Sequence, residues 1–345
     1  MRKFWVAIVA IALAGCGGSN ATVSAQADAG TDSKADGYAS PKDTSPAEAA
    51  NPSGAPYPIV LAHGMGGFGT LKGLPITYFN GIKDDLATIG ETQVFVTLVS
   101  PYDTSENRAL QLAKQIDQIL SQTGKQKVNL IGHSQGSLDA RVLASPDGLG
   151  YGDRLASVTL VAGPNHGSRI ADVVLNILPA TPTLESDLVN ALVQLLERAV
   201  YEVHTDPQLN AQINELSEHY METVFNPKYV DDPRVPYFSY AGRTDDLDGL
   251  PDCLSGLYPD DSTKLDDGQA IIKPMADYLQ DGMHKPNDGL VTVQSARWGT
   301  FMQCVPADHM SEVGQINLSG PNPKSGFDHL QFWRTVVARL RERGY

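Results

Sequence analysis

The chain has 345 residues, 41% of them hydrophobic, and its 26 basic and 40 acidic residues give a formal net charge of −14. This hydrophobic content is enough to fill a core, which excludes wholesale disorder and collagen-like repetition. The acidic balance argues against nucleic acid as the main partner, because phosphate binding requires a basic surface. Three cysteines are too few for a disulfide-rich scaffold. The length allows one large α/β domain or two smaller ones.

Residues 1–16 have the pattern of an export signal. Arg2 and Lys3 give a positive start, and the apolar run after them is too short to span a bilayer comfortably. The run ends in the letters LAGC at Cys16, which resemble the lipobox of bacterial lipoproteins, where cleavage precedes a cysteine that then carries lipid. The alternative is an ordinary secretory signal in which Cys16 is incidental. We therefore expect an exported protein, either anchored by lipid to an outer membrane or cell surface, or secreted.

Residues 17–56 differ in composition from the rest of the chain. They are rich in Ala, Asp, Ser and Thr, with Tyr38 as the only aromatic residue and prolines at positions 41, 46, 52 and 56. Such a segment buries too little apolar surface to offset its ordering entropy, which predicts a flexible tether. The alternative is a poorly ordered N-terminus without a role. The folded domain is expected to begin near Tyr57 and to run to residue 345.

From Tyr57 onward, short apolar runs alternate with helical patterns, which predicts a mostly parallel sheet covered by helices. Five runs are candidate strands: Ile59–Ala62, Val94–Val99, Val128–Ile131, Val158–Ala162 and Val235–Ala241. A helix is expected between the second and third runs, capped by Ser105 and closed by Gly124, with one apolar face against the sheet. A last helix is expected over about residues 326–343, with Trp333 directed inward.

The most informative motif is GHSQG at residues 132–136. A bare G-x-S-x-G is weak, because Gly and Ser are abundant, but this one follows the apolar run 128–131 and precedes a predicted helix at 138–143. That is the strand–turn–helix setting of a nucleophile elbow, in which the glycines leave room for a tight, strained turn. Ser134 is therefore the predicted nucleophile.

A serine hydroxyl needs a base to take its proton and an acid to orient that base. The chain order of this fold is serine, then acid, then histidine, which excludes the five histidines up to His219. His329 lies on the predicted terminal helix beside core residues, where a structural histidine is expected, so His284 and His309 remain. His309 follows the apolar segment 301–305 and lies in a polar turn, a fitting place for a loop-borne base. Asp288 lies in a turn of the preceding loop and is the candidate acid. Asp308 adjoins the histidine in sequence, is poorly aimed at its ring, and is expected on the surface.

The tetrahedral intermediate needs backbone donors for its oxyanion. One is expected to be the N–H of Gln135, at the start of the helix after the nucleophile. The other is expected from the loop after the first strand, AHGMGGF at residues 62–68, where Met65 is the donor by position. A Gly-rich loop after a strand can also cradle a phosphate, but this one has no Lys-Ser/Thr ending and no G-x-G-x-x-G.

The chain resembles the bacterial true lipases of the Pseudomonas and Burkholderia type, which are α/β-hydrolases that cleave triacylglycerols. Four stretches carry the resemblance, together with residues 96–106: YPIVLAHGM at 57–65, KVNLIGHS at 127–134, NDGLV at 287–291 and HMSEVGQ at 309–315. The match is tight before residue 168 and after residue 285, and looser between them. The resemblance implies an α/β-hydrolase fold with a helical cap or lid inserted into it.

Carried over by position, the resemblance assigns Ser134 as nucleophile, Asp288 as acid and His309 as base. It assigns the backbone N–H groups of Met65 and Gln135 to the oxyanion hole. No cofactor is needed for this chemistry. The resemblance also raises a dedicated membrane-bound foldase as a folding partner, a question that the residues leave open.

The family binds a structural calcium near the catalytic histidine, and the residues of this chain depart from the family's ligand pattern. An aspartate is usual two residues after the histidine, where this chain has Ser311, whereas the glutamine six residues after it is kept as Gln315. Calcium prefers several charged oxygens, so the loss of one weakens the site or abolishes it. The upstream aspartate of the family has four candidates in this chain: Asp260, Asp261, Asp266 and Asp267.

Beyond Cys16, the chain has two cysteines, Cys253 and Cys304. In the family the second half-cystine lies just beyond the catalytic acid, which is not the arrangement here. Outside the cytoplasm two remaining cysteines most often pair. A bridge over this loop is expected to stabilise the fold by roughly 3–4 kcal/mol in the chain-entropy model.

Residues 168–225 are the expected cap region. Part of it has an amphipathic pattern with apolar residues at helical spacing: Leu184, Leu188, Leu192, Leu195 and Ala199. The ordinary reading of such a stripe is a helix packed on the core. The functional reading is a lid that covers Ser134 in water and opens its apolar face onto lipid.

The predicted function is therefore ester hydrolysis through an acyl-enzyme, most directly of triacylglycerols at a lipid–water interface. One alternative is the same machinery acting on short soluble, sterol or polymeric esters. Another is a non-catalytic surface lipoprotein that uses the hydrolase fold for binding. The complete set of catalytic groups argues against this last alternative.

Overall fold

The computed structural model describes residues 57–70, 76–176, 191, 202, 205–244, 266, 269–283, 285–316 and 320–345. The chain divides into two units, Met1–Asn51 and Pro52–Tyr345, and all described residues belong to the second unit. The predicted signal at 1–16 and the predicted tether at 17–56 therefore lie outside the described residues.

The centre of the second unit is a six-stranded parallel sheet with the strand order β2-β1-β3-β4-β5-β6. Its strands are β1 (Ile59–Ala62), β2 (Val94–Thr97), β3 (Val128–His133), β4 (Leu155–Val161), β5 (Tyr237–Gly242) and β6 (Thr300–Val305). The sheet is wound in both directions from β1, and in such sheets ligands bind beyond the carboxyl ends of the strands near the reversal. This arrangement confirms the predicted α/β architecture.

All five predicted strands are present, β1 with the predicted ends and the other four with shifted ends. The sixth strand, β6, was expected only as an apolar segment. Its last three residues, Gln303 to Val305, are buried, whereas Thr300 is exposed. The strand therefore lacks the continuous apolar run that marks a fully buried parallel strand.

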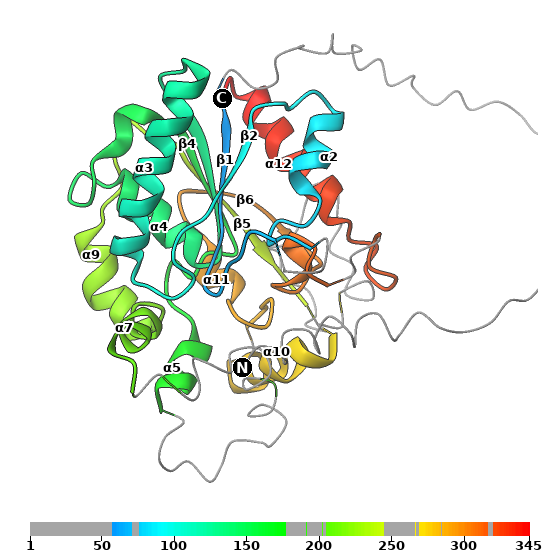
Figure 1. The fold of residues 1–345 in the computed structure, drawn as a ribbon. Coiled ribbons are helices and arrows are strands. Elements are labelled where there is room, and N and C mark those ends of the chain that lie inside the picture. Colours follow the sequence, from blue (N-terminus) through cyan, green and yellow to red (C-terminus); the bar gives the residue numbers. More distant parts are fainter. Residues whose placement is uncertain are drawn as a thin grey trace, which may run out of the picture. The chain divides into compact units, whose positions relative to one another are not determined.

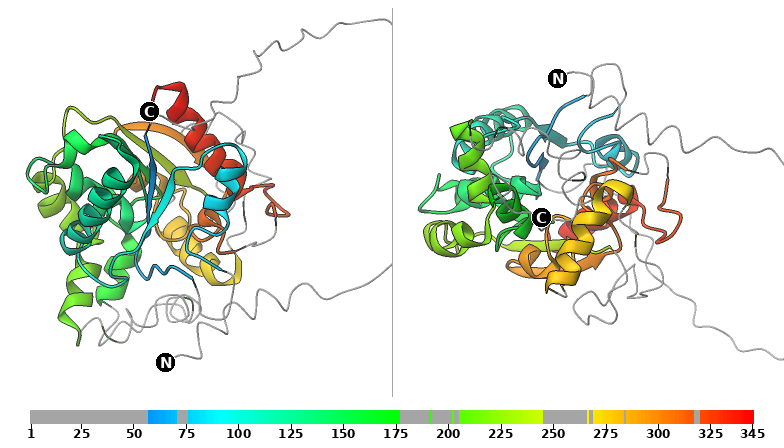
Figure 2. Two further views of the ribbon diagram at one scale, coloured as in Figure 1. Left: turned by 45° about the horizontal axis from the view of Figure 1, so that its top comes forward. Right: turned by 90° about the horizontal axis from the view of Figure 1, so that it is seen from below.

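Helices cover both faces of the sheet (Figures 1 and 2). On one face, α3 (Ser105–Thr123) and α4 (Gln135–Ala144) bury Leu112, Ile116 and Leu138 against alternate residues of the strands. On the other face, α2 (Ile82–Thr88) and α12 (His329–Glu342) do the same, with Trp333 fully buried. The alternation along each strand therefore divides the core into two layers.

Helix α3 begins one residue earlier than the sequence analysis expected. The side chain of Thr104, not that of Ser105, caps the helix by accepting a hydrogen bond from the N–H of Asn107 (3.4 Å). Ser105 is the first helical residue and is buried. The predicted end is confirmed, because Gly124 has a φ of 66°, the left-handed conformation that closes many helices.

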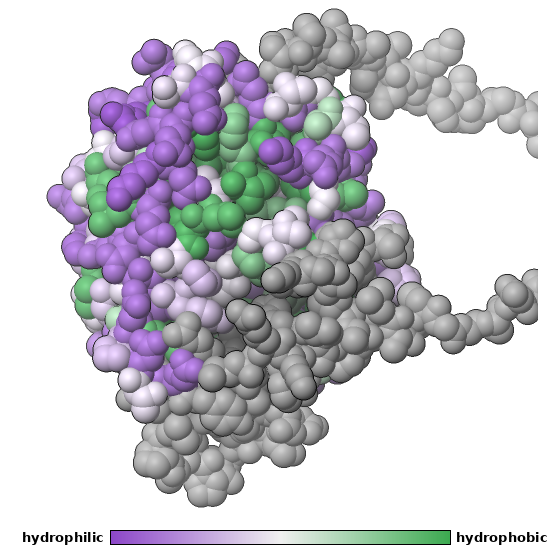
Figure 3. Space-filling model, in the orientation of Figure 1, coloured by the Kyte–Doolittle hydropathy of each residue, from purple (hydrophilic) through white to green (hydrophobic). Residues whose placement is uncertain are grey.

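Strand β2 forms one edge of the sheet, and two glutamines of α3 pair with the backbone beyond it. The side-chain oxygen of Gln115 accepts from the N–H of Leu98 (3.0 Å), and its amide nitrogen donates to the carbonyl of Leu98 (2.8 Å). Gln111 accepts in the same way from the N–H of Ser100 (2.9 Å). Apolar residues gather on the surface between α3 and α2 (Figure 3), and the side chain of Leu98 is 52% exposed.

A third group of helices lies at the lower end of Figure 1, beyond the carboxyl ends of the strands. It consists of α5 (Arg169–Asn176), α7 (Pro207–Glu215) and α10 (Gln269–Met283), which share an apolar cluster containing Ile170, Ile213 and Ile272. The short elements in the described part of the chain are η1 (Tyr151–Arg154), α8 (Glu218–Tyr220), η2 (Met221–Phe225), α9 (Asn226–Lys228), α11 (Val293–Ala296) and η5 (Ser311–Val313).

The five residues of the apolar stripe, for which a packed helix and a lid are the two predicted alternatives, lie outside the described residues: Leu184, Leu188, Leu192, Leu195 and Ala199. Within the described part of the chain, no helix combines the length and the apolar character that crossing a membrane requires.

Candidate active site

Ser134 joins β3 to α4 in a strained turn. Its φ of 57° and ψ of −131° lie where L-residues are rare, a conformation that costs of order 1–3 kcal/mol and is typical of functional sites. The flanking glycines are required by space. A Cβ on Gly132 would lie 2.3 Å from the carbonyl oxygen of Gly136, and a Cβ on Gly136 would lie 2.3 Å from that of Ala62. The turn therefore has the geometry expected of a nucleophile elbow.

Asp288 and His309 come from separate loops and form a buried pair. Asp288 lies between α10 and α11, and His309 lies between β6 and η5. The Nδ1 of His309 is 2.7 Å from Oδ2 of Asp288. The other carboxylate oxygen accepts from the N–H groups of Leu290 (2.9 Å) and Val291 (2.7 Å), which fixes the carboxylate in place. Because Nδ1 faces a carboxylate, it carries the hydrogen and leaves Nε2 as the basic nitrogen.

The serine and histidine loops meet beyond the carboxyl ends of the strands. The ring of His309 lies against that of His133, the residue before Ser134, with centroids 4.7 Å apart. The loop after β1 also lies against Ser134, since a Cβ on Gly64 would lie 3.0 Å from the Oγ of Ser134. The structure therefore brings the three predicted catalytic residues into one neighbourhood.

The loop after β1, which contains Met65, is held by a neutral histidine. The Nδ1–H of His63 donates to the carbonyl of Gly64 (2.8 Å), and its Nε2 accepts from the N–H of Val99 (3.2 Å). Burial and the nearby Arg108 lower the pKa of His63 to about 4, so the ring is uncharged near neutrality. Arg108 also donates to the carbonyl of His63 (2.5 Å).

A second network lies behind the nucleophile and was not predicted. The Nδ1 of His133 accepts from the hydroxyl of Tyr78 (2.8 Å), and its Nε2–H donates to Oε2 of Glu312 (3.0 Å). Burial and the nearby His309 hold the pKa of His133 well below its ordinary value. Burial, and then the carboxylates of Asp288 and Asp308, raise the pKa of Glu312. Ligand atoms of His133, His309 and Glu312 lie within 4.8 Å of one another, but the hydrogen bond between His133 and Glu312 already joins two of them.

The prediction that Asp308 lies on the surface is wrong, because the residue is fully buried. Its Oδ1 accepts from the N–H groups of Met310 and Ser311 (both 2.9 Å), and its Oδ2 accepts from the hydroxyl of Ser311 (2.6 Å). These donors come from its own turn and satisfy the carboxylate without water. Burial, and then the neighbouring Asp266, raise the pKa of Asp308 well above its ordinary value.

The predicted calcium ligands lie in this same region. Ser311 is buried and hydrogen-bonded to Asp308, and the side-chain nitrogen of Gln315 donates to the carbonyl of Tyr78 (3.2 Å). Among the four upstream candidates, Asp266 is described and fully buried, and one of its oxygens accepts from the N–H of Asp308 (3.3 Å). Two adjoining buried aspartates and a hydroxyl fit a hard cation such as calcium. The remaining candidates, Asp260, Asp261 and Asp267, lie outside the described residues.

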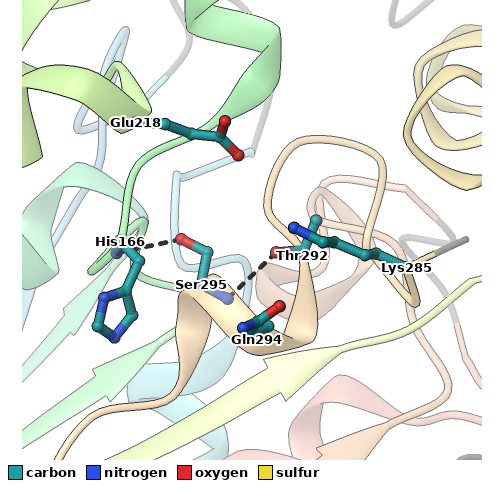
Figure 4. A pocket seen from close by; sticks show the side chains of 6 residues that line it. All are labelled: His166, Glu218, Lys285, Thr292, Gln294 and Ser295. Atoms are coloured by element: carbon teal, nitrogen blue, oxygen red, sulfur yellow. Dashed lines mark hydrogen bonds between the residues drawn. The ribbon is translucent and has the colours of Figure 1, made fainter. Parts of the chain in front are cut away.

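A cavity of about 210 Å³ lies beside the loop that carries Asp288 (Figure 4). Figure 4 shows Glu218 and Lys285 on opposite sides of this opening, with His166 and Ser295 along one wall. The hydroxyl of Ser295 accepts a hydrogen bond from the N–H of His166 (3.2 Å), so these two residues of the wall are bonded to each other. The cavity therefore borders the loop of Asp288, but Ser134, Asp288 and His309 are not among its lining residues.

Of the two cysteines predicted to pair, Cys304 is buried in β6 and Cys253 lies outside the described residues. The pairing therefore stays a prediction.

Comparison with known proteins agrees with this geometry. The profile of the α/β-hydrolase fold family matches residues 57–213. Among solved structures, the mature form of a Bacillus licheniformis lipase superposes with a TM-score of 0.56 at 20% identity, over 85% of this chain and 95% of that one. A Staphylococcus hyicus lipase gives a TM-score of 0.55 at 17% identity, over 83% and 95% of the two chains. Fold and elbow together define the chain as an α/β-hydrolase.

Sequence similarity to curated relatives identifies the family within this class. A triacylglycerol lipase of Vibrio cholerae is 31% identical over 306 residues, covering 84% of this chain and 88% of the relative. A triacylglycerol lipase of Pseudomonas fragi is 47% identical over 116 residues, 34% of this chain and 37% of the relative. One of Burkholderia plantarii is 28% identical over 84% of this chain and 87% of its own length. The chain belongs to the bacterial triacylglycerol lipase family, as the resemblance had predicted.

Proposed function

We propose that the protein is a lipase that hydrolyses fatty-acyl esters, triacylglycerols above all, through an acyl-enzyme on Ser134. The observation that carries this proposal is the buried hydrogen bond between His309 and Asp288 beside a serine held at φ 57°. Relatives named as triacylglycerol lipases support the substrate class.

In the first half of the reaction, Nε2 of His309 takes the proton of Ser134 while the hydroxyl oxygen attacks the ester carbonyl. Asp288 keeps the hydrogen of the histidine on Nδ1 and stabilises the imidazolium that forms. The backbone N–H groups of Met65 and Gln135 donate hydrogen bonds to the developing oxyanion. His309 then gives its proton to the departing alcohol, and water repeats the sequence on the acyl-enzyme.

The test is hydrolysis of a short soluble ester and of an emulsified long-chain triacylglycerol by the purified protein, with Ser134→Ala as control. Strong activity on the emulsion that is lost in the variant is expected. Activity on the soluble ester alone would make the protein an esterase. A folded protein that cleaves neither ester, and whose Ser134 does not react with a fluorophosphonate, would instead be a binding lipoprotein.

The domain boundaries and location are part of the proposal. Residues 1–16 act as a signal, Cys16 receives lipid after cleavage, and residues 17–56 tether the catalytic domain to a membrane surface. The lipobox-like sequence at the end of the apolar run supports this location. Mass spectrometry of the exported protein tests it, since a free amine on a residue other than Cys16 would indicate ordinary secretion.

The cap at residues 168–225 acts as a lid over the site. Its described flanks, α5 and α7, share an apolar cluster with α10 beyond the strand ends, which supports a cap anchored at both sides. Activity that rises sharply when substrate exceeds its solubility supports the lid, and a smooth saturation curve contradicts it. A foldase as partner is tested by refolding the denatured protein alone.

Calcium would be held by Asp266 and Asp308, with Ser311 and Gln315 nearby. The bound ion would neutralise the negative charge of these two adjoining buried carboxylates. It would stabilise the loop before His309 and take no part in bond making. The disulfide between Cys253 and Cys304 would hold the same segment. A calcium-dependent rise in melting temperature tests the ion, and thiol titration of the native protein tests the disulfide.

A further inference from the structure

Helix α7 reaches into the catalytic centre through a buried polar side chain. Gln212 is fully buried, on a helix that also buries the apolar side chains of Leu209 and Ile213 and the polar side chain of Glu215. Burying an amide without partners costs of order 1–3 kcal/mol, so a buried glutamine is normally hydrogen-bonded. The Nε2 of Gln212 has acceptors, whereas its Oε1 has no partner among the described residues. Its hydrogen bonds therefore indicate what it does.

The two hydrogens of this amide have separate acceptors. Nε2 of Gln212 donates to the side-chain oxygen of Gln135 (2.8 Å) and to the carbonyl of Pro101 (3.3 Å). Gln135 follows the nucleophile and supplies one of the two proposed oxyanion donors. The carbonyl of Pro101 also accepts from the N–H of Gly66 (2.8 Å), the residue after Met65, which supplies the other. One amide group thus joins the two loops that form the proposed oxyanion hole.

The side chain of Gln135 is held at its other end as well. Its nitrogen donates to the carbonyl of Asp103 (3.0 Å) and lies within hydrogen-bond distance of the Ser105 hydroxyl (3.4 Å). The N–H of Ser105 in turn donates to Glu215, one turn beyond Gln212 on α7 (2.7 Å). Gln135 is therefore fixed from two sides, and α7 supplies contacts to both.

From this geometry we propose that Gln212 is a positioning residue, which couples α7 to both backbone donors of the oxyanion hole. This inference rests on the proposed function and extends it. Because one side chain of α7 contacts both loops, a displacement of this helix would loosen both donors together. An oxyanion donor is effective only when preorganised, and small misplacements reduce the rate strongly.

The experiment compares Gln212→Met with Gln208→Met in the full chain, using a soluble ester. Met has similar length but no N–H donor, and Gln208 is exposed on the same helix, so it is a matched control. We expect Gln212→Met to lower kcat by about 10- to 100-fold with KM changed by less than about twofold. Inhibition by an alkylboronic acid, whose serine adduct places an oxygen in the oxyanion position, is expected to weaken in parallel. Gln208→Met is expected to behave as wild type.

A double variant separates positioning from general damage. If Gln212 acts through Gln135, then Gln212→Met is expected to cost clearly less when Gln135 is already Met. If Gln212→Met does not fold, the kinetic test is carried out on Gln135→Met alone. Wild-type kcat in the folded variant, or full additivity in the double variant, overturns the inference. A wild-type protein that cleaves no ester refutes the proposed function itself and the inference with it, so the two failures are distinguishable.

Discussion

Glu215 gives the protein a pH-dependent stability whose size can be worked out from its surroundings. The carboxylate is 6% exposed at the end of α7 and accepts a hydrogen bond from the N–H of Ser105 (2.7 Å). Burial dominates this hydrogen bond and raises the pKa of Glu215 to about 7, from 4.5 in an unfolded chain. The folded state therefore binds the proton more tightly, and the free energy of unfolding falls as the pH rises from 4.5 through 7. Each tenfold change in proton affinity is worth about 1.4 kcal/mol, so ionising Glu215 at pH 8 costs the fold about 3 kcal/mol.

Replacing Glu215 by Gln removes this penalty, because the amide stays neutral and its oxygen still accepts from Ser105. Urea unfolding followed by tryptophan fluorescence is expected to give nearly equal stabilities for the variant and wild type at about pH 4.5. At about pH 8 the variant is expected to be more stable by up to about 3 kcal/mol. Glu222→Gln, at an exposed position, is the control. A stability difference for Glu215→Gln that stays constant across this pH range would refute the reasoning.

Three further changes test the catalytic centre and the fold. Asp288→Asn is expected to lower kcat by about 10³- to 10⁴-fold, because the amide favours the wrong tautomer of His309; undiminished steady-state hydrolysis would exclude this residue as the acid. Gly64→Ala would place a Cβ 2.6 Å from the Cβ of Ser134, so kcat is expected to fall by at least about tenfold, and a variant with wild-type kcat would show that the loop can shift freely. Thr104→Ala removes the cap of α3 and is expected to lower the free energy of unfolding by about 1 kcal/mol in a urea titration, with activity unchanged.

Local patterns explain what could be predicted from the sequence. The elbow at Ser134 depends on a strand, two glycines and a helix that follow one another in the chain, so its geometry could be anticipated. The start of α3 was misplaced by one residue because Thr104 and Ser105 are both good caps, and only the backbone shows which one is used.

Long-range contacts account for what could not be predicted. Gln212 and Glu215 are polar residues on an amphipathic helix, and the usual expectation is that such residues face water. Both are buried because they are hydrogen-bonded to Gln135 and Ser105. These partners lie over 75 positions away in the chain, so the local pattern around α7 does not indicate them. Asp308 is a similar case, since donors within its own turn allow a carboxylate to be buried where a polar loop indicates exposure.

The glutamines beside β2 have a consequence for how the protein behaves at high concentration. An open sheet edge offers unpaired N–H and carbonyl groups to the strands of other molecules, which is a common route to aggregation. Near Leu98 these groups are already taken, because the amide of Gln115 bonds both of them as a neighbouring strand would. Copies crowded together, as on the surface of an oil droplet, would therefore meet an edge that resists strand addition at Leu98, whose apolar side chain is exposed. Gln115→Ala would open this edge, and the variant is expected to aggregate more readily while the sheet itself stays intact.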